Sequence, residues 1–307
     1  MSAKVCIAGC GDVGMRIAHR LEKSGVATNT ILAIVRSDSS FHSLKEKGFH
    51  SRAMDFDDLE KILSVDDIQK RGEAFKGITQ LYYLVPPQKK GTTDNRSSTF
   101  LQFLKSTGFI QSSHQDTNKK IILISTTGVY GDCEGEVVTE EMPMNPTTER
   151  SKRRADMESQ WQQFSVEFGM TLSILRVPGI YSFSRLPRKR LETKTPVVDP
   201  NECGYTNRIH ADDLAMICQV VMNNQEQSDI YNVSDGTPGK LSQYLLDVAD
   251  FLDITPPEII SLEEGYEKIS TGMMSYLTES RKIDNTKILN QFNLQLSYPD
   301  YREGIKF

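Results

Sequence analysis

The sequence predicts an α/β fold in which helices cover both faces of a doubly wound parallel sheet. Two observations lead to this prediction: short apolar runs recur without polar alternation, and segments of helical periodicity lie between them. Uninterrupted apolar runs are typical of parallel strands that are buried on both faces. The expected strands are Val5–Ala8, Ile31–Val35, Leu81–Val85, Ile121–Ile124 and Leu172–Val177.

Apolar residues at helical spacing separate the expected strands. One set consists of Val13, Ile17 and Leu21, and another of Phe100, Phe103 and Leu104. Such spacing places the apolar side chains on one face of a helix, which then packs against a sheet. Because strands and helices alternate, we expect right-handed crossovers between parallel strands.

The second part of the chain has a different pattern, with prolines at positions 178, 187, 196 and 200. We expect a helix opening near Asp212, a short strand at Ile230–Val233 and a helix at Leu241–Leu252. The prediction is a main domain over residues 1–177 and a smaller C-terminal lobe over residues 178–307. Later strands of the sheet can come from this lobe, so we expect the two parts to be interleaved.

The composition excludes several classes of function. The net charge of −5 over 307 residues gives no basic field that would favour nucleic acid or an anionic membrane. No apolar run approaches the roughly 20 residues that span a bilayer, so we expect a cytoplasmic protein. The five cysteines form no CxxC pair, which disfavours a disulfide framework and a zinc site, and we expect no metal.

The clearest motif is a GxGxxG formed by Gly9, Gly11 and Gly14, directly after the first expected strand. The first glycine permits a tight turn, the second a close approach of backbone to ligand, and the third close packing of helix on strand. Asp12 and Val13 open the helix, whose free N–H groups and dipole face an anion. These five residues predict a Rossmann-type site for the pyrophosphate of NAD or NADP.

The end of the second expected strand predicts which dinucleotide is preferred. NAD-binding sites place a carboxylate there, about 20 residues after the glycines, but this chain has Arg36 and Ser37. A guanidinium and a hydroxyl suit a 2′-phosphate, so NADP is favoured over NAD. Asp38 lies close by, and Arg36 as a solvated charge is the alternative.

Two further segments are expected to line the nucleotide site. Asp55 and Phe56 follow the short third strand, where the adenine ring lies in such folds; the competing role for Asp55 is a helix cap. Val85, Pro86 and Pro87 end the fourth strand and face the crevice outside the carboxyl ends of the strands.

Several further motifs follow the glycine turn in order along the chain. They are Ser125-Thr-Thr-Gly-Val-Tyr-Gly131, Leu175-Arg-Val-Pro-Gly-Ile-Tyr181, Asn207-Arg-Ile-His-Ala-Asp-Asp-Leu214 and Arg281-Lys-Ile-Asp-Asn285. With the turn, they resemble the short-chain dehydrogenase/reductase superfamily, specifically its extended and atypical members related to NAD(P)-dependent sugar epimerases and dehydratases. The resemblance implies an oxidoreductase or epimerase-like enzyme acting on a hydroxyl or carbonyl of a sugar-like or other small polar substrate.

The resemblance also implies a catalytic set. Such enzymes use a Ser or Thr that orients the substrate oxygen, a Tyr as acid and base, and a Lys that holds the nicotinamide ribose and lowers the pKa of the Tyr. Thr126 matches the first position and Lys152 the third. The Tyr should lie four residues before Lys152, where this chain has Thr148, whose hydroxyl is far less acidic than a phenol. Tyr130 is the candidate substitute, with packing as its alternative role.

Other positions are assigned through the same resemblance. Pro178, Gly179 and Tyr181 match the stretch that passes the nicotinamide, and Tyr181 is a second candidate for the missing phenol. For the small-molecule substrate we expect contacts from the residues Thr127, Arg185 and Arg208. A salt bridge within the lobe is the alternative for the two arginines.

The motif around His210 is expected to position the lobe. His210 is a third candidate to replace the missing phenol, because an imidazole ordinarily titrates near neutrality. A structural, hydrogen-bonded role at the helix start is the alternative that we favour. Asp212 or Asp213 is expected to cap the helix that follows.

Two hypotheses for the whole protein stay open. The intact glycine turn with Thr126 and Lys152 favours an enzyme, whereas the missing phenol at Thr148 favours a non-catalytic dinucleotide sensor. Relatives often form homodimers through two helices, and a candidate surface is the helix over residues 147–168 with Met157 and Trp161. The alternative is that those side chains pack on the sheet of their own chain.

Overall fold

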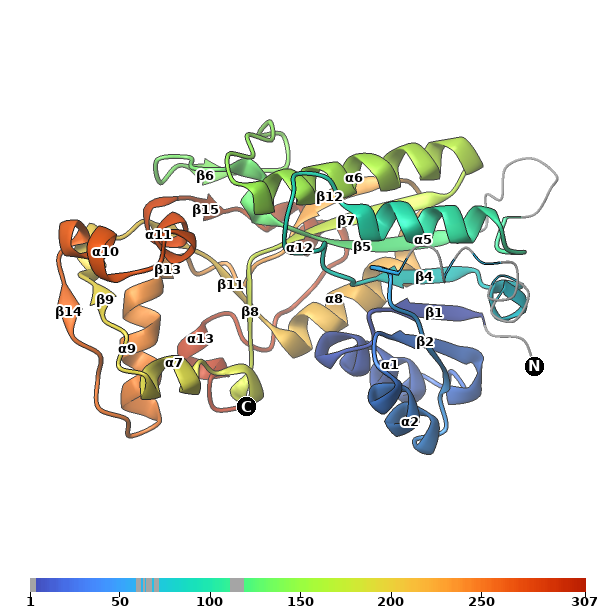
Figure 1. Ribbon diagram of the computed structural model, residues 1–307, viewed down its shortest axis with the longest axis horizontal. Helices are drawn as coiled ribbons and strands as arrows, with labels where there is room; N and C mark the ends of the chain where they lie inside the picture. Colours follow the sequence, from blue (N-terminus) through green and yellow to red (C-terminus); the bar gives the residue numbers. More distant parts are fainter. Residues whose placement is uncertain (1–3, 59–61, 63, 65–67, 69–71, 111–118) are drawn as a thin grey trace. The chain divides into compact units, whose positions relative to one another are not determined.

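The computed structural model describes residues 4–58, 62, 64, 68, 72–110 and 119–307. The chain divides into two compact units (Figure 1). Unit 1 comprises residues 1–129, 146–176 and 214–231, and unit 2 comprises residues 130–145, 177–213 and 232–307. The division therefore follows spatial contacts and not a single cut after Val177.

Unit 1 is built on a sheet of seven strands in the order β12-β7-β5-β4-β1-β2-β3. The strands are β1 (Val5–Ala8), β2 (Ile31–Val35), β3 (His50–Ala53), β4 (Gln80–Tyr83), β5 (Lys120–Thr126), β7 (Thr171–Val177) and β12 (Asp229–Asn232). The pairs β1/β2, β1/β4, β2/β3 and β4/β5 are parallel. The predicted doubly wound parallel sheet is confirmed.

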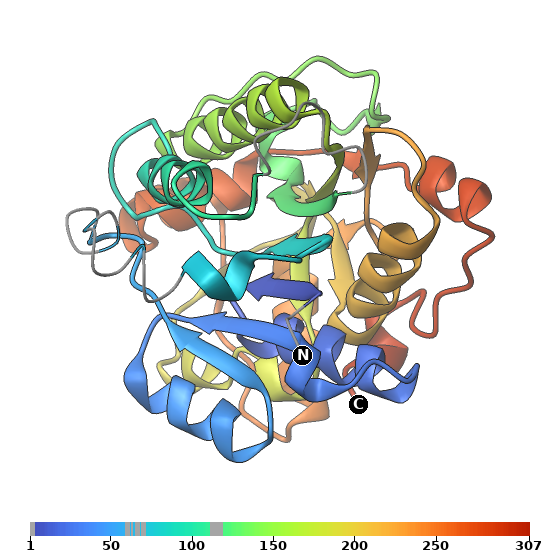
Figure 2. The ribbon, with the colours of Figure 1, turned by 90° about the vertical axis from the view of Figure 1, so that its right-hand side faces the viewer.

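Helices cover both faces of this sheet. They are α1 (Asp12–Lys23), α2 (Asp38–Glu46), α5 (Asn95–Lys105), α6 (Glu149–Phe168) and α8 (Ala211–Asn224). Figures 1 and 2 show α5 and α6 on one face, with α1 and α2 on the other. The strands β1 and β2 have the predicted bounds, whereas β4 ends at Tyr83 and not at Val85. Two consecutive prolines follow Val85, and a proline has no backbone N–H with which to pair to a neighbouring strand.

An aromatic core lies between the sheet and the pair α5 and α6. Phe100, on α5, is fully buried against Tyr83, with ring centroids 5.5 Å apart. Trp161 and Met157 of α6 are also fully buried in this cluster, and the Trp161 centroid lies 4.6 Å from that of Tyr83. These α6 side chains therefore pack on their own sheet, which is the second of the two alternatives left open by the sequence.

Unit 2 consists of four two-stranded pairings and short helices. The pairings are β6 (Val137–Val138) with β15 (Lys282–Ile283), β8 (Gly179–Tyr181) with β11 (Arg208–His210), β9 (Val197–Val198) with β14 (Ile259–Ile260), and β10 (Tyr205–Thr206) with β13 (Gly239–Lys240). Its helices are α7 (Arg188–Glu192), α9 (Leu241–Phe251), α10 (Leu262–Lys268), α11 (Thr271–Thr278), α12 (Thr286–Gln291) and α13 (Tyr301–Gly304). Strands of two or three residues carry no readable period, so the sequence did not predict them.

Single turns of 3-10 helix connect several elements. They are η1 (Thr28–Thr30), η2 (Glu73–Phe75), η3 (Thr127–Tyr130), η4 (Phe183–Arg185) and η5 (Pro200–Glu202). Within the described ranges, no helix is long and apolar enough to cross a membrane.

A buried ion pair joins α6 to the sheet of unit 1. Glu158 is fully buried, and its carboxylate accepts a hydrogen bond of 2.8 Å from Nη2 of Arg176 on β7. The hydroxyl of Ser125, the penultimate residue of β5, donates to the same carboxylate. Two strands and one helix therefore meet at one charged group, which fixes the position of α6 along the strands.

Replacement of Glu158 by alanine is expected to destabilise unit 1 strongly. The Glu158→Ala change would leave the buried Arg176 guanidinium without its carboxylate, which costs about 3–5 kcal/mol. Glu167→Ala is the matched control on the same helix, since Glu167 pairs with Lys105 in an exposed bridge worth less than about 1 kcal/mol. Chemical denaturation of both variants measures the difference. Equal losses of unfolding free energy would contradict the assignment.

Candidate functional site

The glycine turn connects β1 to α1, and its backbone is closely packed at two of the three glycines. A Cβ on Gly9, whose φ is +85°, would lie 3.0 Å from the backbone of Leu84 and Val85. A Cβ on Gly14 would lie 3.1 Å from the carbonyl oxygen of Gly9, whereas one on Gly11 would meet nothing within 4 Å. The first and third glycines are thus required by backbone packing, and the second faces open space at the start of α1.

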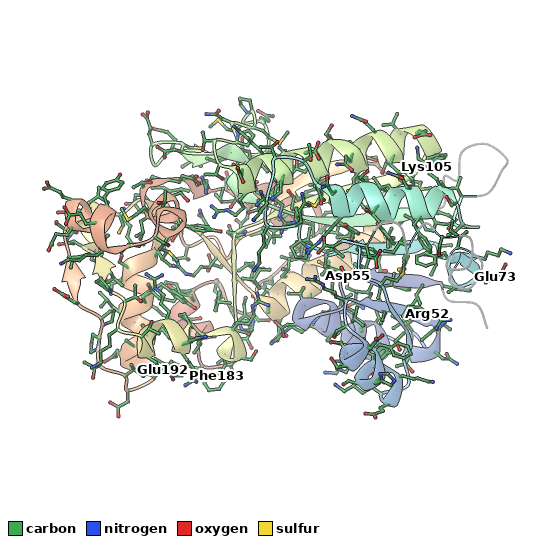
Figure 3. All side chains as sticks on the ribbon, viewed as in Figure 1. Arg52, Asp55, Glu73, Lys105, Phe183 and Glu192 are labelled. Atoms are coloured by element: carbon green, nitrogen blue, oxygen red, sulfur yellow. The ribbon has the colours of Figure 1, made fainter. Side chains whose placement is uncertain are left out.

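A cavity of about 200 Å³ lies beside this turn, at the carboxyl ends of the strands. It is lined by the residues Gly9, Ile34, Val35, Arg36, Met54, Asp55, Phe56, Val85, Pro86 and Arg96. Figure 3 labels Asp55 in this region, with Glu73 at the far end of the same unit. Because pockets for whole drug-sized ligands measure about 300–1,000 Å³, this cavity suits one part of a larger ligand.

Arg36 is the most exposed charged group at the cavity. Its side chain is 66% exposed, and Nε donates a hydrogen bond of 3.2 Å to Asp55. Its Nη2 lies 3.4 Å from the carboxylate of Asp57. The hydroxyl of Ser37, the expected second donor, caps α2 by accepting from the N–H of Ser40. Asp55 accepts a hydrogen bond from the N–H of Asp57. This bond is typical of a local turn and is compatible with a ligand contact.

Arg96 was not identified from the sequence. Its Nε and Nη2 each donate a hydrogen bond of 2.6 Å to Asp57, and Nη1 donates to the carbonyl oxygen of Pro86 at 2.9 Å. The hydrogen bond from Arg96 lowers the pKa of the Asp57 carboxyl, and Arg36 adds to this effect. Arg96 is the second residue of α5, 60 residues after Arg36, so no local pattern connects the two.

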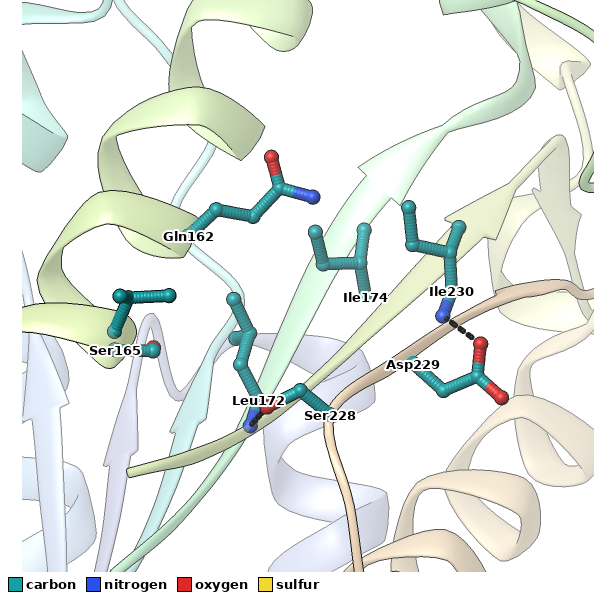
Figure 4. Close-up of a pocket in the computed structure, with 8 residues that line it drawn as sticks. Gln162, Ser165, Leu172, Ile174, Ser228, Asp229 and Ile230 are labelled. Atoms are coloured by element: carbon teal, nitrogen blue, oxygen red, sulfur yellow. Dashed lines mark hydrogen bonds between the residues drawn. The ribbon is translucent and has the colours of Figure 1, made fainter. Parts of the chain in front are cut away.

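A second cavity of about 440 Å³ lies at the other edge of the sheet (Figure 4). It is lined by the residues Gln162, Ser165, Val166, Leu172, Ile174, Ser228, Asp229 and Ile230. Leu172 and Asp229 stand at or next to the first positions of β7 and β12, so this cavity faces the amino ends of those strands. Ligands of doubly wound sheets bind at the carboxyl ends, and we assign no nucleotide to it.

Thr126 and Lys152 both belong to unit 1. Thr126 is the last residue of β5, and its hydroxyl accepts from the N–H of Gly128 at 3.2 Å. Lys152 is exposed in the first turn of α6. Hydrogen bonds from Ser125 to Glu158 and from Arg154 to the carbonyl oxygen of Ile124 hold α6 against the end of β5. The helix that carries Lys152 is therefore fixed on the strand that carries Thr126.

Thr148 has a structural role at the position expected for the phenol. It caps α6, since its hydroxyl accepts from the N–H of Ser151 at 3.1 Å and the Ser151 hydroxyl accepts from the N–H of Thr148. This reciprocal pair is a capping box, which satisfies two N–H groups at a helix start. The sequence pattern around Thr148 therefore serves the helix.

Tyr130, the candidate substitute, is 1% exposed in unit 2. Its hydroxyl donates a hydrogen bond of 2.8 Å to the side-chain oxygen of Asn232. The amide nitrogen of Asn232 donates in turn to the carbonyl oxygen of Val138. This geometry favours the packing role for Tyr130.

His210 has the structural role at the helix start that the sequence favoured, whereas Asp213 does not cap the helix. The N–H of Asp212, at the start of α8, donates to Nδ1 of His210, so His210 is the residue that binds the helix start. The carboxylate of Asp213 instead accepts from the N–H groups of Ser297 and Tyr298, both at 2.9 Å. Of the two aspartates that the sequence offered as the cap, Asp213 is therefore excluded, because its side chain binds a distant segment of unit 2.

A buried polar cluster surrounds Arg208 in unit 2. Its side chain lies among the rings of Tyr244 and Tyr301, at 4.2 and 5.1 Å from the ring centroids. Nη1 of Arg208, Oδ2 of Asp235 and the hydroxyl of Tyr181 have no hydrogen-bond partner within the described ranges. Burial raises the pKa of the Asp235 carboxyl to about 7, against the opposing effects of the Thr237 N–H and Arg208. Burial also raises the pKa of the Tyr181 phenol.

The remaining predicted positions are placed as follows. Arg185 is exposed in η4, whereas Arg208 is 4% exposed. Thr127, after β5, is buried. Pro178 lies between β7 and β8, and Gly179 opens β8, whose register pairs Tyr181 with His210. The guanidinium of Arg208 packs on aromatic rings. Its contact with a substrate stays a prediction.

Comparison with known proteins gives a consistent result. A sequence model of the NAD dependent epimerase/dehydratase family matches residues 5–234, which is well over half of the chain. The chain is 24% identical over 298 residues to Protein YeeZ of Escherichia coli (strain K12), and the match covers 97% of each. The predicted family resemblance is confirmed.

Two solved structures show the same fold. A functionally unknown conserved protein from Silicibacter pomeroyi DSS has a TM-score of 0.74 and 20% identity, with 99% of this chain and 97% of that chain covered. The UDP-glucose 4-epimerase of Thermus thermophilus, solved with NAD, has a TM-score of 0.71 and 17% identity, with 99% and 96% covered.

The raised pKa of Asp235 makes the stability of the protein depend on pH. The folded state holds the proton more tightly than the unfolded chain, whose pKa is about 3.9, so stability falls as pH rises from about 4 to about 7. Asp235→Asn stays neutral and can still accept from the N–H of Thr237. We expect the free energy of unfolding of this variant to exceed that of the wild type by roughly 1 kcal/mol at pH 4.5 and by roughly 4 kcal/mol at pH 8.

Urea denaturation at several pH values measures this effect. Asp250→Asn, at an exposed position of α9, removes an equal charge and serves as the control. Parallel stability curves for the wild type and Asp235→Asn would contradict the assigned pKa.

Proposed function

Because the chain belongs to the NAD dependent epimerase/dehydratase family, we propose that unit 1 binds a dinucleotide of the NAD(P) type, with NADP preferred. The observation that carries this proposal is the cavity at the carboxyl ends of the strands, which joins Gly9 of the turn to the guanidinium of Arg36. The pyrophosphate would lie at the start of α1, where Gly11 leaves open space. Asp55 and Phe56 would border the adenine ring, and Val85 and Pro86 the opposite wall.

The preference for NADP rests on charge at the end of β2. A carboxylate that would bind the ribose hydroxyls of NAD is replaced by Arg36, whose planar guanidinium suits a phosphate. Ser37 supports this only weakly, because its hydroxyl is used in capping α2. Asp38, the nearest carboxylate in sequence, forms no ion pair with Arg36 in the described structure. The charge of Asp38 therefore does not neutralise the guanidinium.

We further propose that the protein is an oxidoreductase or epimerase-like enzyme acting on a hydroxyl or carbonyl of a sugar-like or other small polar substrate. The cofactor would supply the hydride chemistry. Lys152 would donate to the nicotinamide ribose, and the Thr126 hydroxyl would orient the substrate oxygen. The family match and the likeness to a UDP-glucose 4-epimerase solved with NAD support this class of reaction. Arg185, being exposed, is the better candidate of the two arginines for an anionic substrate group.

A second candidate function is a non-catalytic dinucleotide sensor. It is favoured by the capping role of Thr148 and the buried, hydrogen-bonded hydroxyl of Tyr130, which leave no phenol at the usual position. In that case the bound nucleotide would change the affinity for a partner or the conformation, which requires different binding to two states.

Replacement of Arg36 is expected to remove the preference for NADPH. In a fluorescence titration of the full chain, the wild type should bind NADPH more tightly than NADH. Arg36→Asp should weaken NADPH binding by about tenfold or more, since a charge-assisted contact worth about 1.5–3 kcal/mol is lost. It should not weaken NADH binding, because a carboxylate at this position suits the ribose hydroxyls. Lys45→Asp, at an exposed position of α2, is the control of equal charge change. No binding of either nucleotide to the wild type would refute the site.

Replacement of Lys152 distinguishes the enzyme hypothesis from the sensor hypothesis. We expect oxidation of NADPH with at least one member of a panel of nucleotide sugars, sugars and small ketones, and loss of that turnover in Lys152→Ala. Lys105→Ala, an exposed lysine of the same unit, should keep full activity. Tight NADPH binding without turnover on any substrate would favour the sensor.

A further inference from the structure

The nucleotide cavity of unit 1 contains a cluster of two guanidinium groups and two carboxylates, formed by Arg36, Arg96, Asp55 and Asp57. Asp57 connects the two arginines: it accepts two hydrogen bonds of 2.6 Å from Arg96 and lies 3.4 Å from Nη2 of Arg36. Both arginines line the cavity. The cluster has no net charge, so Arg36 does not act as an isolated cation.

The two arginines differ in how firmly they are held. Arg96 is 14% exposed and has three of its N–H groups committed to Asp57 and to the carbonyl oxygen of Pro86. Arg36 is 66% exposed, and among the described residues its ion pairs are the two longer contacts to Asp55 and Asp57. A guanidinium has five N–H donors in a planar fork, so both retain donors for a ligand. Arg96 is therefore a fixed cation, and Arg36 is one that can reorient.

We propose that Asp57 is the residue that sets the affinity of this site for a phosphate monoester, because its carboxylate competes with the phosphate for Arg36 and Arg96. Arg96 is then the second cation for the phosphate. This inference rests on the proposed nucleotide site and specifies how that site distinguishes 2′-phosphorylated adenosine from adenosine without this phosphate.

The competition follows from charge. A phosphate monoester carries about −1.5 to −2 charges at pH 7 and three strong acceptor oxygens, and paired guanidinium groups are well suited to it. Asp57 occupies the same donors with one charge of the same sign. The hydrogen bond from Arg96 lowers the pKa of Asp57, which keeps its carboxyl ionised at neutral pH. The incoming phosphate must displace this carboxylate or lie beside it, whereas a ligand without the phosphate meets neither cost.

If Asp57 instead positioned Arg36, the ratio of the two affinities would change in the opposite direction. If Asp57 served to position Arg36 for the phosphate, removal of its charge would weaken the phosphate contact. The sign of the change in discrimination therefore decides between competition and positioning.

The experiment is calorimetric titration of the full chain with adenosine 2′,5′-bisphosphate and adenosine 5′-monophosphate, which differ only in the 2′-phosphate. Asp57→Asn should bind the bisphosphate about 3- to 10-fold more tightly than the wild type and the monophosphate within about twofold. Asp38→Asn removes an equal charge from a residue without an ion pair to Arg36 in the described structure, and should change the ratio of the two affinities much less. Arg96→Gln should lower that ratio.

Three results would overturn the proposal: an unchanged or lower ratio in Asp57→Asn, an equal gain in Asp38→Asn, or an unchanged ratio in Arg96→Gln. If Asp57→Asn fails to fold, as judged by its thermal melt, Asp55→Asn tests the same sign because it releases Arg36 from its other carboxylate. Failure of the wild type to bind either probe, and NADH and NADPH as well, would refute the nucleotide site itself. Binding of the monophosphate with no effect of Asp57 would refute only this inference.

Discussion

The close approach of backbone at the glycine turn is the constraint on which the site of unit 1 depends. Gly9 passes within contact distance of the chain leaving β4 at a positive φ, and Gly14 packs α1 against β1, so a side chain at either position would crowd the backbone. The turn therefore fixes the start of α1 beside the ends of four parallel strands. Oriented N–H groups and a cavity lined by the neighbouring strand ends then follow from the topology of the sheet, with no further specialised motif.

Electrostatic balance governs the rest of the cavity at the strand ends. Arg36 alone would present an uncompensated cation, but Asp55, Asp57 and Arg96 surround it with two carboxylates and a second guanidinium. The exposed pairs of Arg36 are worth little in stability, so they can be exchanged for ligand contacts at small cost, whereas the bidentate pair of Arg96 with Asp57 is held more firmly. By contrast, the fully buried pair of Glu158 and Arg176 is structural, since either group without its partner would be a buried charge.

The helix start at Thr148 explains why a missing phenol does not disturb the fold. The threonine hydroxyl and Ser151 satisfy the first N–H groups of α6, while Glu158 further along the helix fixes it to β5 and β7. Lys152 is held between these two anchors. Unit 1 therefore fixes the positions of Lys152 and Thr126 without a phenol at position 148.

The sequence by itself determined the elements that depend on local patterns. The bounds of β1 and β2, the buried face of α1 and the GxGxxG turn follow from the period of apolar residues and from glycines whose spacing has one structural use. Only the tertiary structure decided which charges meet: Arg96 joins Arg36 through Asp57, and Asp213 binds residues 297 and 298. The two-residue strands of unit 2 were also decided there. These contacts join positions far apart in the chain, and no period or motif in one sequence records a pairing that arises only when the strands and helices pack.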